Sequence, residues 1–454
     1  MSGPNLVCYP CLVADASIGV DGGGTSLRGR QWLIAVRLAW RRSIGSRQHL
    51  SLPLLAVGFL AAVAQVPLGL SNAAFGSHNE IISVAKSLAA TGRFQDPFGS
   101  VTGATAHVAP VYPAILAAIM ILLRQPALVV AGAIFVNAFL WGLTAALLPI
   151  LSQRIYGRAA PGNVGGILVV LSSWMMPQWE TALSAALLLA ATMAVLSDGA
   201  VRAGLWSGVC LLANPVSLPM LLLVSVSRGR RFAAVSMLVA LGVTGPWVLR
   251  NWVELGTPYF VRDNLGLELY ISNNDEAGPL LRANAALANH HPTQNEREAM
   301  RVASMGEGPY NRMRLHDGVR WIAAHPRRFL SLSAARVFYY WFTNPREGWT
   351  APAEWLLTIL GAVGVWISRR NRGAMYLAAG SVCYFLPFVC IQVCGRYHAP
   401  VLWVSALLGG CAITFLWPRL SSLSKHSERW HRGSREPVPA PEGLELTWLP
   451  TREQ

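Results

Sequence analysis

The segment from Glu80 to Pro113 contains the side chains best suited to chemistry. It reads EIISVAKSLAATGRFQDPFGSVTGATAHVAPVYP and follows the first long apolar stretch of the chain. A carboxylate can take a proton from an attacking hydroxyl group, and an ionisable residue beside a membrane span is costly enough to favour a functional role. We therefore expect Glu80 and Asp96 to be catalytic. We expect His107 and Tyr112 to contact a substrate.

Three of these side chains also have a structural interpretation. Glu80 lies in the first turn of an amphipathic helix predicted over 79–91, where a carboxylate stabilises the helix dipole. Gly92 can end that helix. Asp96 stands before a proline, an arrangement typical of turns. His107 could be a hydrogen-bonded structural group, so both interpretations stay open.

Other candidate substrate-binding residues lie far from this segment in the sequence. They are Glu180, Arg250, Arg262, Arg396, Tyr397 and His398. Arginine side chains bind phosphate oxygens in a bidentate way. If these residues meet on one face, they would suit an anionic, lipid-linked substrate. The alternatives are that Glu180 is simply solvated at a hairpin tip and that Arg396 reaches lipid headgroups.

Composition indicates an all-α polytopic membrane protein. Hydrophobic residues make up 53% of the chain and charged residues 13%, and the mean hydropathy is +0.40. A soluble domain has about 25% charged residues. The net charge of +15 fits basic cytoplasmic loops better than nucleic-acid binding. Cys8 and Cys11 form a lone C-x-x-C, which does not indicate a zinc site without a second pair.

The charge bias of the loops predicts about ten spans with a cytoplasmic N-terminus. Between 204 and 227 one continuous helix would place the arginines of RGRR outside, whereas a helix broken at Asn214-Pro215 places them inside, and we favour the break. The stretch 111–123 is predicted to be a helix that lies in the interface, and the stretch 328–342 is predicted to lie flat on the outer surface. The predicted spans are 51–70, 127–150, 163–176, 181–197, two short helices within 204–227, 232–249, 353–367, 374–393 and 400–417.

This topology divides the chain into five parts. They are a disordered basic cytoplasmic leader (1–50), a transmembrane module (51–249) with the first outer loop (71–126), an outer loop region (250–352), C-terminal transmembrane helices (353–417) and a disordered cytoplasmic tail (418–454). The candidate site residues then all fall on the outer side. The outer carboxylates and arginines can therefore form one site.

Four sequence blocks carry a family resemblance. They are EIISVAKSLAATGRFQDPFG with TGATAHVAPVYP (from 80 to 113), GPWVLRNWVELGTPYFVRDNLGLELYISNN (245–274), HPRRFLSLSAARVFYYWF (325–342) and GRYHAP (395–400). With these blocks in this order, the chain resembles bacterial membrane glycosyltransferases of the GT-C superfamily. The branch it resembles (family 39) contains protein O-mannosyltransferases and the lipid A aminoarabinose transferase. The resemblance covers about 50–420.

The resemblance implies a polyprenyl-phosphate sugar donor, an essential carboxylate at Glu80 and a site on the outer face of the bacterial cytoplasmic membrane. The acceptor, whether a glycan, lipid or protein, is not specified, and membrane lipids are the other partners. Two positions depart from the family pattern. Asn79 replaces an acidic residue, which weakens a paired-carboxylate or metal interpretation, and Asn214 replaces an arginine. No cofactor is implied, although a divalent metal would be compatible.

Two other classes of function remain as alternatives. A transporter or flippase would account for the many spans and the broken helix, but it predicts ionisable residues near the midplane and usually repeated halves. The spans here are nearly free of charge. A non-catalytic scaffold with the same fold is the second alternative. Release of free polyprenyl phosphate from a lipid-linked sugar would favour the enzyme over both.

Overall fold

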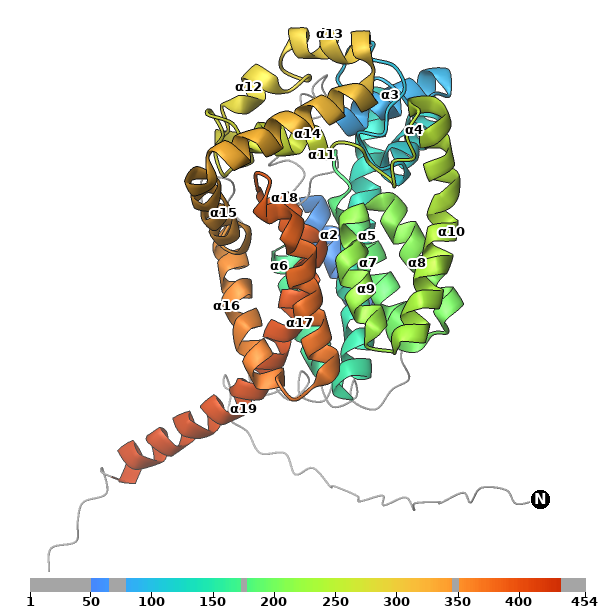
Figure 1. Ribbon diagram of the computed structural model, residues 1–454. Helices are drawn as coiled ribbons and strands as arrows, with labels where there is room; N and C mark the ends of the chain where they lie inside the picture. Colours follow the sequence, from blue (N-terminus) through green and yellow to red (C-terminus); the bar gives the residue numbers. More distant parts are fainter. Residues whose placement is uncertain (1–49, 65–78, 173–177, 345–350, 434–454) are drawn as a thin grey trace, which may run out of the picture. The chain divides into compact units, whose positions relative to one another are not determined.

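The computed structural model describes residues 50–64, 79–172, 178–344 and 351–433, and side chains up to Trp417 (Figure 1). Within these ranges the regular elements are helices, and the β-type pairings are the isolated bridges Gln95–Ala104 and Leu280–Val393. The all-α prediction is therefore confirmed for the described chain. The predicted leader (1–50) lies outside it except for residue 50, and the predicted tail (418–454) lies outside it from 434 onwards. The prediction of disorder is wrong for 418–433, because the last membrane-type helix continues to Gly433.

Within the described ranges, four segments are long and apolar enough to cross a membrane. They are α5 (Pro126–Tyr156), α10 (Arg230–Leu255), α16 (Ala351–Ser368) and Gly395–Trp417, which includes α18 (Gly395–His398) and the start of α19 (Leu402–Gly433). Shorter apolar segments are α2 (Leu52–Ala64), α4 (Val111–Leu123), α6 (Ala160–Leu171), α7 (Thr181–Ser197), α8 (Ala200–Ala213) and Pro215–Val226. The count of about ten spans stays a prediction. α19 continues past the predicted boundary at 417.

The predicted helix break at Asn214-Pro215 is confirmed. α8 ends at Ala213, a 3-10 turn covers Pro215–Ser217, and α9 runs from Leu218 to Val226. Proline cannot continue the hydrogen-bond pattern of the preceding helix. The Asn214 side chain accepts a hydrogen bond from Val216 N–H and donates one to the Tyr384 hydroxyl at 3.0 Å. A polar, irregular backbone therefore lies between two short apolar helices.

α8 and α10 run parallel and in close contact. Gly204 lies against Ser236 and Val239, and a Cβ at this glycine would be 2.5 Å from the Ser236 carbonyl oxygen. Because α9 lies between them in sequence, it must return toward the end where α8 begins. Arg228, just after α9, donates to the Val195 carbonyl oxygen at the end of α7. The basic loop thus lies beside the C-terminus of α7, as the broken helix requires.

Four helices of the 250–352 region pack together near the first outer loop. They are α11 (Leu265–Ser272), α12 (Ala286–His290), α13 (Glu296–Met305) and α14 (Glu307–Ala324). The next helix, α15 (Pro326–Trp341), packs instead against α14, α16 and α18. Figure 1 shows α11–α14 and α3 (Glu80–Thr91) near the same end of the helical bundle. α11 and α14 approach closely because Gly266 has no side chain: a Cβ there would be 1.9 Å from the Asn311 carbonyl oxygen.

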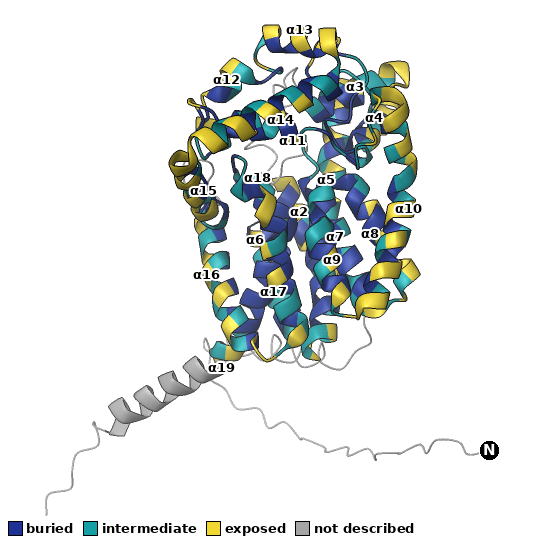
Figure 2. Ribbon diagram, viewed as in Figure 1, coloured by how far each residue is buried: buried dark blue, intermediate teal, exposed yellow. Residues whose placement is uncertain are grey.

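Burial distinguishes the interior of the bundle from its surface (Figure 2). Most residues of α7 and residues 402–412 of α19 are buried, whereas α10 exposes large apolar residues, including Leu238, Leu249 and Val253. Exposed apolar surface of this kind marks a lipid or protein contact. α17 (Arg372–Phe385) and the following 3-10 helix η6 (Leu386–Val389) pack near α9 and α15. The structure therefore has the surface pattern of a helical membrane protein.

Candidate active site

A cavity of about 540 Å³ lies where α3, α7, α11, η6 and α18 meet. Its volume is in the range of small-molecule binding sites, roughly 300–1,000 Å³. Apolar residues from the α9 and η6 segments form part of the lining. The chemically active side chains in its wall are Glu80, His107, Glu180, Arg262, Glu268, Tyr384, Arg396 and Tyr397. The cavity therefore combines an apolar wall with several ionisable groups.

Glu80 is held by the start of α3. The Asn79 side chain caps this helix by accepting a hydrogen bond from Ile82 N–H at 3.0 Å, and Gly92 ends it with φ 71°. The apolar face of α3, including Ile81 and Val84, is buried. Burial raises the pKa of Glu80 above its ordinary value, and the nearby positive charge of Arg396 opposes that rise. Asn79 thus has a capping role, and Glu80 is a carboxyl group that can hold a proton more easily than usual.

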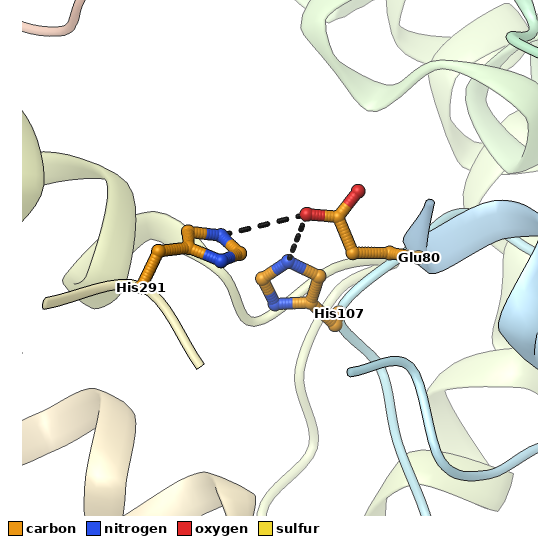
Figure 3. Close-up of side chains that lie close together, drawn as sticks. All are labelled: Glu80, His107 and His291. Carbon is orange, nitrogen blue, oxygen red and sulfur yellow. Dashed lines mark ion pairs between the residues drawn. The ribbon is translucent and has the colours of Figure 1, made fainter. Parts of the chain in front are cut away.

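Two histidines point at the same oxygen of Glu80 (Figure 3). His291 Nε2 lies 3.4 Å from Glu80 Oε1, and His107 Nε2 lies 3.9 Å from it. His107 comes from the first outer loop and His291 follows α12. Burial lowers the pKa of His107 well below its usual value and that of His291 to about 4. Both imidazoles are therefore neutral at pH 7 and can donate or accept hydrogen bonds at Glu80.

The Glu80, His107 and His291 cluster also has the composition of a metal site. Their ligand atoms lie within 4.8 Å of one another, and a carboxylate with two imidazoles is a common zinc donor set. His291 Nδ1 lies 3.1 Å from the Thr293 backbone nitrogen and 2.6 Å from the Thr293 hydroxyl oxygen. If Nδ1 accepts from the backbone N–H, the proton of a neutral imidazole lies on Nε2 and can be donated to Glu80. If Nδ1 instead donates to the hydroxyl oxygen, Nε2 is free to bind a metal.

Arg396 is the arginine best placed to bind an anion. Its guanidinium group lies 3.5 Å from the centre of the Trp179 ring and donates to the Tyr397 hydroxyl at 3.3 Å. Its Nε is buried and has no hydrogen-bond partner in the described chain. A buried N–H without an acceptor is costly. Because Arg396 also lines the cavity, the part of its guanidinium group that faces the cavity could donate to an anionic oxygen there.

Arg262, unlike Arg396, uses its guanidinium group mainly for contacts within the protein. It forms an ion pair with Glu180 at 3.9 Å, and its Nε donates to the His107 carbonyl oxygen at 2.9 Å. Arg262 thereby links the segment before α11 to the first outer loop. It adds positive charge to the cavity wall and, through its bond to the His107 carbonyl oxygen, helps to orient His107.

Asp96 and Arg250 lie outside the cavity lining and instead hold the first outer loop in shape. Asp96 has φ 59°, and its Oδ1 accepts from the backbone N–H groups of Thr102 and Gly103 at 2.8 and 2.9 Å. Arg250 donates to the carbonyl oxygens of Thr105, at 2.6 Å, and Phe94, at 2.7 Å. We call residues 94–106 together with Arg250 the loop clamp. The hydrogen bonds of Asp96 therefore match the turn role that its position before a proline predicts.

Tyr112 and His398 are also absent from the cavity lining. Tyr112 is buried, and its hydroxyl oxygen accepts from the Asn137 side chain at 2.6 Å. His398 is buried against the rings of Tyr340 and Trp341. Of the predicted site residues, the structure brings together Glu80, His107, Glu180, Arg262, Arg396 and Tyr397, and it leaves out Asp96, Tyr112, Arg250 and His398.

Sequence reasoning missed several cavity residues. Trp179 adjoins the predicted Glu180, and Glu268 lies in a block that carries the family resemblance. Those two could have been found from their neighbours. His291 contacts Glu80 without lining the cavity itself, and it had no local signal, because it follows a short helix in a long polar region and reaches Glu80 only through tertiary packing.

Comparison with known proteins gives a distant structural likeness. No family model matches the sequence, and no curated protein matches it. A solved structure of the archaeal oligosaccharyltransferase AglB from Archaeoglobus fulgidus, with an inhibitory peptide and a dolichol-phosphate, shares 13% identity at a TM-score of 0.42, over 87% of this chain and 53% of that one. The same organism's oligosaccharyltransferase in complex with Zn and sulfate shares 14% identity at a TM-score of 0.47, over 81% of this chain and 49% of that one.

The apo form of that oligosaccharyltransferase has a TM-score of 0.48 and 14% identity, over 83% of this chain and 52% of that one. The chain therefore spans about half the length of the solved structures it matches. Neither the residue roles nor the reaction is taken from these proteins. The function is argued from the cavity of this chain.

Proposed function

We propose that this protein transfers a sugar from a polyprenyl-phosphate donor to an acceptor hydroxyl or amine at the outer face of the cytoplasmic membrane. The observation that carries the proposal is the pairing of Glu80 and Arg396 in one cavity. Glu80 is a carboxylate that can take a proton, and Arg396 has a buried N–H without an acceptor. A proton acceptor for the attacking group and a cation for the departing phosphate are the two contributions that sugar transfer from a lipid phosphate can use.

Arg396 would hold the phosphate of the donor. A guanidinium group forms charge-assisted hydrogen bonds to phosphate oxygens, and the Trp179 ring behind it fixes the plane of the guanidinium. As the bond between the sugar and the phosphate breaks, negative charge grows on the phosphate oxygens. Arg396 stabilises that charge where it develops, and this lowers the barrier more than it strengthens ground-state binding.

Glu80 would act as the general base. The acceptor oxygen or nitrogen forms a bond to the anomeric carbon, the bond from that carbon to the phosphate oxygen breaks, and the acceptor proton passes to Glu80. One displacement of this kind inverts the anomeric configuration. The raised pKa of Glu80 suits a proton acceptor, because a base works best when its pKa approaches the working pH. His107 and His291 orient its Oε1.

The donor's polyprenyl tail would leave the cavity over apolar surface. Leu265 and Pro387 both line the cavity and are exposed, and the neighbouring Leu386 is 54% exposed. A polyprenyl chain that covers these residues would shield their apolar side chains from water, and the rest of the chain would stay in the bilayer. Placed there, the tail would keep the phosphate near Arg396. The chemistry of these residues requires no metal, although the Glu80 cluster could accept one.

Purified protein in lipid nanodiscs tests the proposal. Polyprenyl-phosphate sugars with different head sugars are incubated with extracts of cell-envelope acceptors, and free polyprenyl phosphate is measured. The proposal predicts release by the wild type and a loss in Glu80→Gln, while Glu296→Gln, on the exposed side of α13, serves as a matched control. Movement of the intact donor across proteoliposomes without cleavage would instead establish a flippase.

A further inference from the structure

Two buried carboxyl groups behind the cavity are not used by the proposed reaction. Asp263 and Glu307 are 5% and 2% exposed. Asp263 follows Arg262 in the sequence, and its backbone N–H donates to the Ala106 carbonyl oxygen at 3.1 Å. Glu307 begins α14. The pair thus connects the first outer loop, the segment before α11 and the outer helices.

The two carboxyl groups have different hydrogen-bond environments. Glu307 Oε1 accepts from the Ala106 backbone N–H at 2.6 Å, and its Oε2 accepts from the Thr105 hydroxyl at 2.5 Å. Both oxygens of Asp263 are buried, and the Asn311 and Glu307 side chains lie beside its carboxyl group. Two ionised carboxylates in this buried region would carry a large desolvation cost. Burial raises the pKa of both groups, and the hydrogen bond between them favours the proton on Glu307.

No cation neutralises this pair directly in the described structure. The charged and titratable groups that face it are Arg262, Arg250 and Tyr259. The hydrogen bonds of Arg250 go to the first outer loop and to its neighbour Asn251. Arg262 bonds to the His107 carbonyl and pairs with Glu180. A proton between the two carboxyl groups is therefore the remaining way to avoid two buried negative charges.

We propose that Asp263 and Glu307 share one proton and that this acid–carboxylate pair positions the two cavity residues next to it, His107 and Arg262. The Thr105 hydroxyl that donates to Glu307 also accepts the His107 backbone N–H at 2.9 Å. Arg262 is the direct neighbour of Asp263. If the shared proton were lost, repulsion between the two carboxylates would separate the first outer loop from the segment before α11. These are the segments that carry His107 and Arg262.

The sign of the pH effect follows from burial. Burial raises the pKa of Asp263 to about 6 and that of Glu307 well above its ordinary value. A group whose pKa is raised by folding stabilises the folded state at low pH, and this stabilisation is lost as the pH rises through the folded value. The shared proton should therefore stabilise the pair at low and neutral pH, and this stabilisation should be lost as the pH rises through the raised pKa of Glu307.

Asp263→Asn tests the pair, because an amide N–H can replace the shared proton permanently and still donate to Glu307. The thermal unfolding midpoint of the full chain is measured in nanodiscs from about pH 5 to about pH 9. We expect the wild type and the control Glu296→Gln to lose stability together toward alkaline pH. In Asp263→Asn the loss should vanish or move up by more than about one pH unit. An Asp263→Asn profile identical to that of the wild type would overturn the proposal.

Infrared difference spectra give a second readout that survives poor folding of that variant. They are recorded on Glu80→Gln protein, so that the Glu80 carboxyl group contributes no C=O band. The pair predicts a protonated carboxyl C=O band at neutral pH that disappears on alkalinisation, and its absence would contradict the shared proton. Any effect on turnover rests on the proposed function, but the unfolding and infrared readouts do not, so the two proposals can fail separately.

Discussion

The cavity and the loop clamp each contain a carboxylate and an arginine, but they use them differently. In the loop clamp, Asp96 accepts from two backbone N–H groups and Arg250 donates to two backbone carbonyl oxygens. In the cavity, Glu80 faces two neutral histidines, and Arg396 keeps a buried N–H without a partner. The clamp charges are satisfied by the fold, whereas the cavity charges are only partly satisfied.

This difference explains why residue type and predicted side of the membrane do not by themselves distinguish the residues of the proposed site from those of the loop clamp. All four residues were predicted on the outer side. What separates them is the identity of their hydrogen-bond partners: backbone partners fix loop shape, whereas unsatisfied groups in a cavity can bind and react. The following substitutions test whether the separation holds.

The largest contrast should be between Glu80→Gln and Asp96→Asn. Glutamine cannot take the acceptor's proton, and general-base action contributes about 10²–10⁴-fold, so turnover of Glu80→Gln should fall by that factor. Asparagine at 96 keeps an oxygen that can accept from Thr102 and Gly103, so Asp96→Asn should change turnover by less than about threefold. Steady-state release of polyprenyl phosphate measures both. Equal losses would remove the distinction between cavity and clamp.

The two arginines should separate binding from stability. Arg396→Lys keeps the charge but loses the planar fork, and the loss of one charge-assisted hydrogen bond should lower kcat/KM for the donor by about 10–100-fold. Arg250→Lys should instead lower the thermal unfolding midpoint, with a near-normal KM for the donor. Donor titrations and thermal melts on the same preparations check this. Unchanged kinetics in both Arg396→Lys and Arg396→Ala would exclude Arg396 from the site.

The pH profile of the wild type should reflect Glu80. Because burial raises its pKa above the ordinary value of 4.5, the active carboxylate is lost as the pH falls through that raised value. Below it, turnover should fall about tenfold per pH unit. Asp96→Asn should leave this acidic limb in place. An acidic limb that moved with Asp96→Asn would assign the titrating group to the clamp.

His291 should have a smaller effect than Glu80. A neutral hydrogen bond contributes about 0.5–1.5 kcal/mol, so losing the His291 hydrogen bond in His291→Ala should reduce kcat by about 2–10-fold. His291→Gln can still donate to Glu80 and should recover part of that loss. A reduction in the alanine variant as large as that of Glu80→Gln would indicate that His291 itself takes the proton or holds a required metal.

Metal removal should have the smallest effect. The proposed reaction uses the His291 tautomer in which Nδ1 accepts from the Thr293 N–H and Nε2 donates to Glu80. Dialysis against a strong chelator should therefore change turnover by less than about twofold, within the range of a lost weak contact. Metal content is measured on the same samples. A large loss that added zinc or manganese reversed would assign the Glu80 cluster to a metal.

Part of this account could be predicted from local sequence. The break at Asn214-Pro215, the helix ending at Gly92 and the apolar helix at 111–123 follow from proline and glycine chemistry and from composition. The Glu80–His291 contact could not be predicted, because it depends on how the outer helices pack on the first outer loop. The backbone contacts of Arg250 were equally inaccessible, since they join residues 145 and 156 positions apart.

A structure of the protein with a bound polyprenyl monophosphate is the most direct test of the central claim. The phosphate should lie in the cavity, within hydrogen-bond distance of the Arg396 guanidinium and on the same side as the Glu80 carboxyl group. The Arg250 guanidinium should keep its bonds to Thr105 and Phe94. A phosphate bound at Arg250, or outside the cavity altogether, would contradict the account.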